Sequence, residues 1–259
     1  MAQELVEKTV DEELEEAKRE LAAAVENLVT EDDEPVDNLL SAKHQRLLVE
    51  PLYSSWTPPV EGEPSARRVF LADANVGIFF SPYQPPLVPD MFLSLDVKPR
   101  AEWLDKRHRS YFFWEFGKAP EVAVEIVSNR KGHELDTKLR DYARFGVGHY
   151  IVFDPWHRLG EQTLHTFKLD GQQYRRSVIE DLASVGLSLT LWTGEFEMET
   201  GEWLRWCDAQ GNLIPTGAER ANHEAERANR EAQRASQEAE RVERLAARLR
   251  GLGVNPEEL

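Results

Sequence analysis

The pattern of apolar and polar positions divides this chain into stretches with different periods. In the middle stretch, short apolar runs rich in β-branched residues alternate with polar turns, which predicts buried strands. The predicted strands are Val69 to Phe80, Val88 to Leu95, Tyr111 to Phe116, Val122 to Val127, His149 to Phe153, Leu164 to Leu169, Tyr174 to Val178, Leu187 to Leu191 and Trp203 to Trp206. Turns are predicted at Asp170-Gly171 and Thr193-Gly194. Helical periods predict helices at Ala42 to Leu52 and Glu134 to Phe145, the second ending at Gly146. The mixture predicts an α/β core.

Helical periods dominate both ends of the chain. From Val10 to Leu28, apolar residues recur every three or four positions in an acidic setting, which predicts an amphipathic helix. From Ala218 to Leu249, mostly alanines recur with the same spacing among Glu and Arg. This heptad repeat predicts a coiled-coil helix with an alanine seam. We therefore divide the chain into residues 1–37, a core of residues 38–215, and residues 216–259.

The alanine seam leaves the partner of the C-terminal helix open. Alanine permits close helix approach but buries little apolar area, so pairing through it is weak without larger anchors. The helix can pack against the N-terminal helix, pair with a second copy in a homodimer, or stand alone in solvent.

Two carboxylates interrupt apolar runs of the core. Asp90 lies within residues 87–93 and Glu125 within residues 122–128. A buried ionised carboxylate is costly unless it meets a cation, a charged partner or a proton held by a raised pKa. Two such sites close in sequence indicate a hard metal ion with oxygen ligands.

Lys138 falls in the apolar arc of the second core helix. With successive residues 100° apart, it lies between Tyr142 and Phe145, while the charged residues fill the opposite arc. It can be a lysine whose ammonium reaches solvent, the partner of Glu134 four residues earlier, or a functional group directed at the carboxylates.

Four motifs of the core resemble a known family. They are Pro89-Asp90, Glu125-x-x-Ser128, Lys138-Leu139-x-x-Tyr142-Ala143-x-x-Gly146-Val147 and Tyr150-x-Val152-x-Asp154-Pro155. In this order they resemble the Uma family of restriction-endonuclease-like proteins, within the PD-(D/E)XK nuclease superfamily. The resemblance covers roughly residues 38 to 210. It implies a restriction-endonuclease-like mixed sheet flanked by helices.

The resemblance also implies site roles. In the superfamily an Asp and a Glu bind magnesium, and a lysine two positions after the Glu acts on the water and the phosphate. That position here is Val127, so the resemblance implies that Lys138 takes the role from the following helix. Magnesium needs only one or two protein carboxylates, so Asp90 and Glu125 suffice, with the backbone carbonyl of Ile126 as an additional ligand. We expect Mg²⁺, which Mn²⁺ can replace, and Tyr142 in support.

Charge is unevenly distributed along the chain. Its net charge is −16, and residues 1–37 hold 14 Asp or Glu against 3 Lys or Arg. Residues 38–217 hold 24 against 20, so the core lacks the basic excess usual in nucleic-acid binders. This balance counts against DNA as a substrate without excluding it. Arg130 and Lys131 follow the Glu125 strand directly and are the best-placed candidates for phosphate contact.

The sequence does not support several other classes of protein. The single cysteine excludes a disulfide framework, and the histidines do not show zinc-site or nucleophile–base spacing. His44, on the first core helix, can face the cleft but is more typical of a packed or surface histidine. No apolar stretch is long enough for a membrane span, so we expect a cytoplasmic protein.

The sequence thus predicts a magnesium-dependent endonuclease acting on DNA. Two other hypotheses stay open. One is a non-catalytic scaffold on a nuclease fold, in which the terminal helices oligomerise or recruit a partner. The other is a metal-dependent hydrolase of a different phosphoester.

Overall fold

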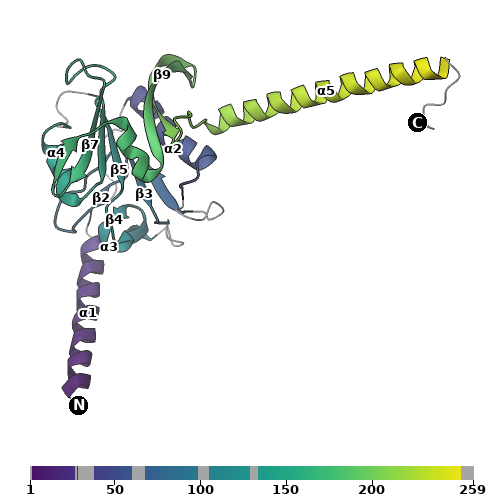
Figure 1. Ribbon diagram of the computed structural model, residues 1–259. Helices are drawn as coiled ribbons and strands as arrows, with labels where there is room; N and C mark the ends of the chain where they lie inside the picture. The colour runs from purple at the N-terminus through teal and green to yellow at the C-terminus, as the bar shows by residue number, and fades with distance from the viewer. Residues whose placement is uncertain are drawn as a thin grey trace. The chain divides into compact units, whose positions relative to one another are not determined.

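A mixed β-sheet forms the centre of the protein. The computed structural model describes residues 2–26, 28, 38–59, 68–98, 105–128 and 134–251. Among these residues, six strands form one sheet in the order β1-β3-β5-β6-β7-β8 (Figure 1). Their bounds are Phe70–Asp73 (β1), Met91–Leu95 (β3), Val122–Ile126 (β5), His149–Phe153 (β6), Leu164–Asp170 (β7) and Gln173–Arg176 (β8). The predicted mixed α/β fold is therefore confirmed.

The parallel pair in this sheet is β5 with β6, in which Glu125 lies opposite Val152. The chain between them crosses over through helix α4 (Thr137–Phe145), as a parallel connection requires. Every other neighbouring pair in the sheet is antiparallel. In particular, β3 runs antiparallel to β5, so the start of β3 and the end of β5 lie at the same end of the sheet.

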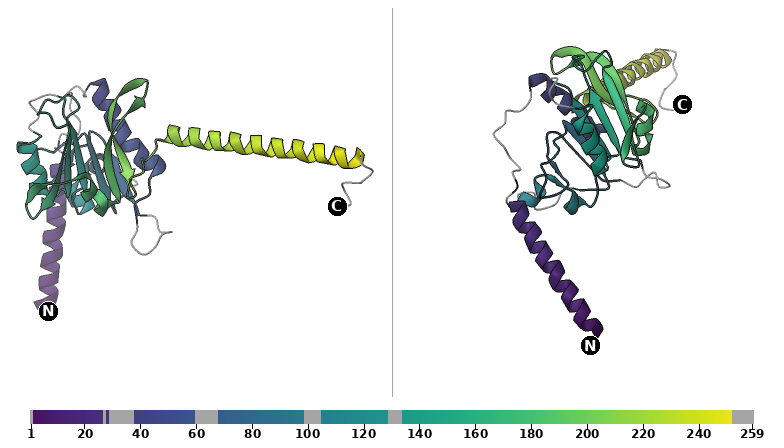
Figure 2. Two further views of the ribbon diagram at one scale, coloured as in Figure 1. Left: turned by 45° about the horizontal axis from the view of Figure 1, so that its top comes forward. Right: turned by 90° about the vertical axis from the view of Figure 1, so that its left-hand side faces the viewer.

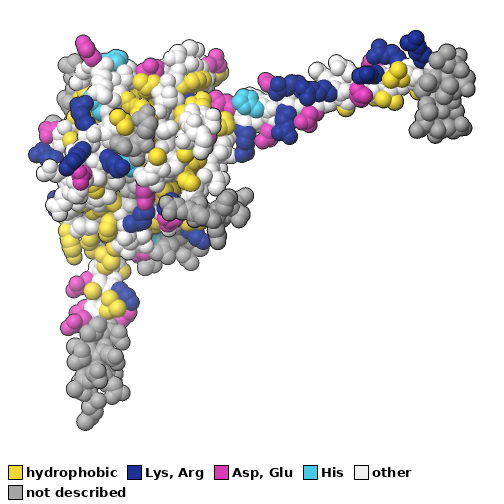
Figure 3. All heavy atoms as spheres, viewed as in Figure 1, with side chains coloured by type: hydrophobic (Ala, Val, Ile, Leu, Met, Phe, Trp, Pro, Cys, Tyr) yellow, Lys and Arg dark blue, Asp and Glu magenta, His cyan; other side chains and the backbone are white. Residues whose placement is uncertain are grey.

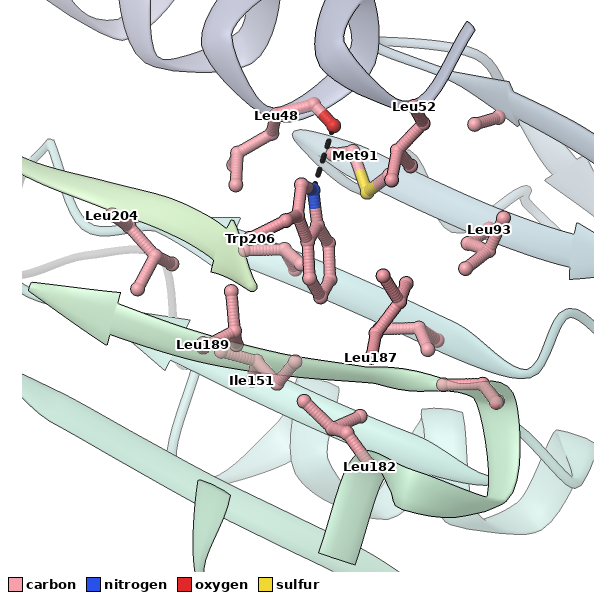
Figure 4. Packing of buried hydrophobic residues seen from close by; sticks show 14 of the residues in the cluster. Leu48, Leu52, Met91, Leu93, Ile151, Leu182, Leu187, Leu189, Leu204 and Trp206 are labelled. Carbon is pink, nitrogen blue, oxygen red and sulfur yellow. Dashed lines mark hydrogen bonds between the residues drawn. The ribbon is translucent and has the colours of Figure 1, made fainter. Parts of the chain in front are cut away.

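The two faces of the sheet are covered by different elements (Figure 2). On one face lie helix α2 (Leu39–Ser55) and the hairpin of β9 (Leu187–Phe196) and β10 (Glu199–Asp208). Figure 4 shows how they meet: the indole Nε1 of Trp206 donates to the carbonyl of Leu48 at 2.8 Å among packed leucines. On the other face, α4 packs through Tyr142 onto β5 and β6, with Leu139 packed against the same cluster. The central strands β3, β5 and β6 are thus buried on both faces, which explains their continuous apolar runs.

Two predicted strands are wrong in part. The run Val69 to Phe80 is broken by a turn at which Asn75 has a φ of 54°, and it gives β1 and a separate short strand β2 (Ile78–Phe79). The run Tyr111 to Phe116 gives β4 (Tyr111–Phe112), which pairs in parallel with β2, and then the one-turn helix α3 (Phe113–Phe116). Gly117 closes this turn with a φ of 75°. Apolar composition alone did not show where each predicted strand ends and the next element begins.

The hairpin of β9 and β10 turns later than predicted. Thr193 and Gly194 lie inside β9, and the turn is Glu197-Met198, where φ is 47° and 65°. Positive φ at both central residues is the geometry of a tight hairpin turn. Gly194 is required for a different reason: a Cβ there would lie 2.1 Å from the ring of Trp192.

Helices at both ends match the prediction. Helix α1 (Ala2–Glu26) buries Val25 against Phe79 and Phe112 at its end. Helix α5 (Gly217–Gly251) lies in a separate compact unit of residues 215–259. It starts with a capping box, in which Thr216 Oγ1 accepts from the Glu219 amide and the Glu219 carboxylate accepts from the Thr216 amide. Its coiled-coil pairing and the boundaries at residues 37 and 215 stay predictions.

Candidate metal-dependent active site

Strand alternation directs Glu125 to the face of the sheet that α4 covers. Its neighbours Val124 and Ile126 point into the core beneath α2, so Glu125 points the other way, together with Ala123 and Val127. Asp90 immediately precedes β3, at the same end of the sheet. Its Oδ2 accepts a hydrogen bond from the Ile126 amide at 2.6 Å. The structure therefore brings the two predicted carboxylates to one place.

Gln45 of α2 holds the other oxygen of Asp90. Its Nε2 donates to Asp90 Oδ1 at 2.8 Å, and its Oε1 accepts from Asn75 Nδ2 at 3.0 Å. The sequence-based reasoning missed Gln45. A signal was present, because Ser41 and Gln45 are polar residues on the helix stripe that continues into Leu48 and Leu52, and all four are buried.

Helix α4 supplies the partners of Glu125. Lys138 Nζ lies 2.8 Å from Glu125 Oε2, and the Tyr142 hydroxyl donates to Glu125 Oε1 at 2.8 Å. Glu125 is 2% exposed, whereas the Lys138 side chain is 32% exposed. Of the three alternatives for Lys138, the structure therefore favours the one in which its ammonium is directed at the carboxylates.

Burial controls the protonation of this cluster. It raises the pKa of Glu125 to about 7, with the charge of Asp90 adding to the rise and Lys138 opposing it. Burial alone would lower the pKa of Lys138, but the attraction of Glu125, Glu134 and Asp90 outweighs it, so that pKa is raised. Burial also raises the pKa of Tyr142 well above its ordinary value, with Glu125 adding to the effect. Tyr142 thus stays a hydrogen-bond donor at neutral pH.

A second tyrosine links the cluster to a further acidic residue. The ring of Tyr150 stacks on Tyr142 with centroids 4.8 Å apart, and its hydroxyl donates to the backbone carbonyl of Glu134 at 3.0 Å. Glu134 is 5% exposed, and its Oε2 has no hydrogen-bond donor among the described residues. Sequence reasoning placed Glu134 in the helix, but α4 begins at Thr137, so Glu134 lies in the turn before it.

Of the other predicted site residues, His44 does not reach the carboxylates. The ring of His44 packs between Phe153 and Trp203, with centroids 5.0 Å and 4.6 Å away, and burial lowers its pKa to about 4. Its neighbour Gln45, rather than His44, reaches Asp90. Arg130 and Lys131 lie outside the described residues. The Ile126 amide binds Asp90, and its carbonyl as a metal ligand stays a prediction.

The donor set fits a hard divalent cation. Among the described residues, His, Cys, Asp and Glu do not gather in any group of three or more that could hold a metal. Two carboxylates are nevertheless enough for Mg²⁺, which usually keeps water or substrate phosphate as its other ligands. Each oxygen of Glu125 accepts one hydrogen bond, from Lys138 or Tyr142, and a carboxylate oxygen has a second lone pair with which to bind a cation.

A comparison with protein families identifies the family of this mixed α/β protein. The model of the Uma2 family, described as "Putative restriction endonuclease", matches residues 34–201, more than half of the chain. The chain belongs to the Uma2 family, which confirms the resemblance drawn from its motifs.

The other comparisons add little. Among solved structures, the chain is similar to a "putative nuclease belonging to DUF820" from Anabaena variabilis ATCC 29413. The identity is 18% and the TM-score 0.37, over 55% of this chain and 69% of that one, which is too weak to carry an argument. No curated protein matches this chain. Within the described residues, no helix combines the length and apolar character that crossing a membrane demands.

Proposed function

We propose that this protein is a magnesium-dependent endonuclease that hydrolyses phosphodiester bonds in DNA. One observation carries the proposal: the buried carboxylates of Asp90 and Glu125 meet at one end of the sheet, with the Lys138 ammonium 2.8 Å from Glu125. A buried acidic group with a perturbed pKa, as Glu125 is, that lies against a lysine is typical of a functional site. Membership in a family described as "Putative restriction endonuclease" supports the same reaction.

Each residue has a definite task in this proposal. Asp90 and Glu125 hold Mg²⁺ or Mn²⁺, and the ion supplies charge neutralisation at the phosphate and a water of lowered pKa when bound. Gln45 and the Ile126 amide fix the orientation of Asp90. Lys138 orients the attacking water and stabilises negative charge on the phosphate oxygens.

Tyr142 acts through Glu125 in this proposal. Its hydroxyl donates to Glu125 Oε1, which fixes the carboxylate against α4. It is not a general base, because its pKa lies well above the ordinary value and its proton is already engaged.

The charge distribution is compatible with DNA as the substrate. Residues 1–37, outside the core, hold most of the acidic excess. Figure 3 shows several Lys and Arg side chains on the part of the core that carries α4, with acidic side chains scattered among them. Phosphate contacts from such side chains position DNA without reading its sequence.

Plasmid cleavage tests the proposal. Purified protein is incubated with supercoiled plasmid and with single-stranded DNA, with Mg²⁺, with Mn²⁺ or with chelator, beside Glu125→Gln. We expect nicked and linear products that require the metal and are absent with Glu125→Gln. Cleavage that persists in chelator or in the variant would overturn the assignment. Absence of cleavage by a wild type that binds metal would favour the non-catalytic scaffold.

Helix α5 supports a second role for this protein, in assembly. Its side chains from residue 220 to 244 are exposed, including the alanine seam and Val242, which is 56% exposed. An exposed apolar seam with regular heptad spacing is typical of a helix that pairs. We propose that it pairs with a second copy in a homodimer, which would bring two active sites to one duplex.

A further inference from the structure

The Lys138–Glu125 ion pair presents a problem for metal binding. Asp90 and Glu125 are the carboxylates assigned to the metal, yet the Lys138 ammonium already lies 2.8 Å from Glu125 Oε2. A divalent cation arriving at Glu125 would meet this positive charge at short range. In a buried site, repulsion between like charges is weakly screened. Metal binding is therefore easier if the ammonium has another place to go.

Glu134 provides such a place. Its carboxylate is buried, and its Oε2 has no donor among the described residues. A buried carboxylate oxygen without a partner is rare and needs an explanation. Glu134 lies four residues before Lys138 in the turn that leads into α4, and its negative charge already acts on the Lys138 ammonium.

The surroundings of Glu134 are fixed relative to the site. Tyr150 donates to the Glu134 carbonyl at 3.0 Å, and the Tyr150 ring stacks on Tyr142, which is bonded to Glu125. Glu134 is thereby tied to the same aromatic pair that holds Glu125. The Lys138 side chain is flexible and partly exposed, so it has the freedom to turn from one carboxylate to the other.

We propose that Glu134 is a positioning residue that receives the Lys138 ammonium when Glu125 binds a metal ion. This inference rests on the proposed function, because it takes Asp90 and Glu125 as metal ligands. Glu134 keeps Lys138 charged and beside the site while freeing Glu125 Oε2. Without the Glu134 charge, Lys138 stays on Glu125 and competes with the cation.

Mn²⁺ affinity in a double-mutant cycle tests the proposal. Free Mn²⁺ is measured by electron paramagnetic resonance for wild type, Glu134→Gln, Lys138→Met and the double variant. Asp136→Asn is the matched control, because it removes an exposed carboxylate from the same turn, where it pairs with Arg140. We expect Glu134→Gln to weaken Mn²⁺ binding about tenfold, the range seen when outer-shell partners of ligands are removed. In the Lys138→Met background the same change should have almost no effect.

Each outcome is decisive. An equal loss in both backgrounds would make Glu134 a ligand or a structural residue and overturn its role toward Lys138. Unchanged affinity in Glu134→Gln would overturn that role as well, while leaving the metal site intact. A wild type that binds no Mn²⁺ would instead overturn the metal site of the proposed function. If Glu134→Gln fails to fold, a Mn²⁺-soaked wild-type crystal decides: Lys138 Nζ should then lie within hydrogen-bond distance of Glu134 and away from Glu125.

Discussion

Replacing Glu125 by Gln should stabilise the metal-free protein at alkaline pH. Gln has nearly the same shape and keeps one carbonyl oxygen, which can accept from Tyr142, while its amide nitrogen takes the place of the oxygen beside Lys138. What it removes is the charge of a carboxylate that is 2% exposed. Keeping a costly buried charge is expected where that charge serves function at the expense of stability.

The size and sign of the effect follow from the pKa of Glu125. Burial raises it from 4.5 to about 7 in the folded protein. The folded state therefore retains a proton that the unfolded state has lost, so wild-type stability falls as pH rises through this window. The full penalty above pH 7 is up to about 3 kcal/mol, from roughly 1.4 kcal/mol per pKa unit. In the variant an amide nitrogen takes the place of the oxygen that accepts from Lys138, and the loss of this hydrogen bond offsets about 1 kcal/mol at every pH. A net gain of about 2 kcal/mol remains.

Urea unfolding between pH 5 and pH 9 in the presence of chelator measures this gain. Glu125→Gln should be about 1 kcal/mol less stable than wild type near pH 5, where Glu125 is protonated, and about 2 kcal/mol more stable near pH 8. Glu202→Gln on β10, where the side chain is exposed, serves as the control and should show no such pH dependence. A variant less stable than wild type at pH 8, or a difference independent of pH, would mean that the Glu125 charge does not destabilise the folded protein.

Three further predictions follow from the same contacts. Tyr142→Phe keeps the stacked ring but loses the donor to Glu125, and urea unfolding at pH 8 should show a loss of about 1–2 kcal/mol; no loss would mean that this hydrogen bond contributes nothing. Lys138→Met should lower kcat for plasmid cleavage by roughly 100-fold with little change in KM, and a change confined to KM would contradict a role in the transition state. Truncation after Pro215 should leave the core folded, as measured by circular dichroism, and should halve the mass in light scattering. Double-strand cleavage should be lost while nicking of single strands persists. An unchanged mass would remove the assembly role.

Much of the site could be predicted because charge within apolar runs is a local signal. Asp90 and Glu125 were identifiable from their own neighbours in the sequence. The 100° spacing placed Lys138 on the apolar arc of its helix, and Gly146 closes that helix as predicted, with a φ of 85°. These features depend on residues a few positions apart, which is the range over which periodicity is informative.

The rest of the site depends on contacts between distant elements. Gln45 and Asp90 are 45 positions apart in the sequence, and no local pattern predicts the hydrogen bond between them. A pair of Glu134 with Lys138 along one helix was among the three alternatives for Lys138, but the helix begins only at Thr137. The break at Asn75 was missed because apolar residues on both sides of it form strands of two different sheets, so the apolar run has no gap that marks the break.

An anomalous difference map from crystals soaked in millimolar Mn²⁺ shows directly whether the two carboxylates hold a metal ion. We expect a peak between the carboxylates of Asp90 and Glu125 in wild type and none in Glu125→Gln. A map without a peak there in wild type, or with a peak that survives in the variant, would contradict the assignment of these two residues as the metal site.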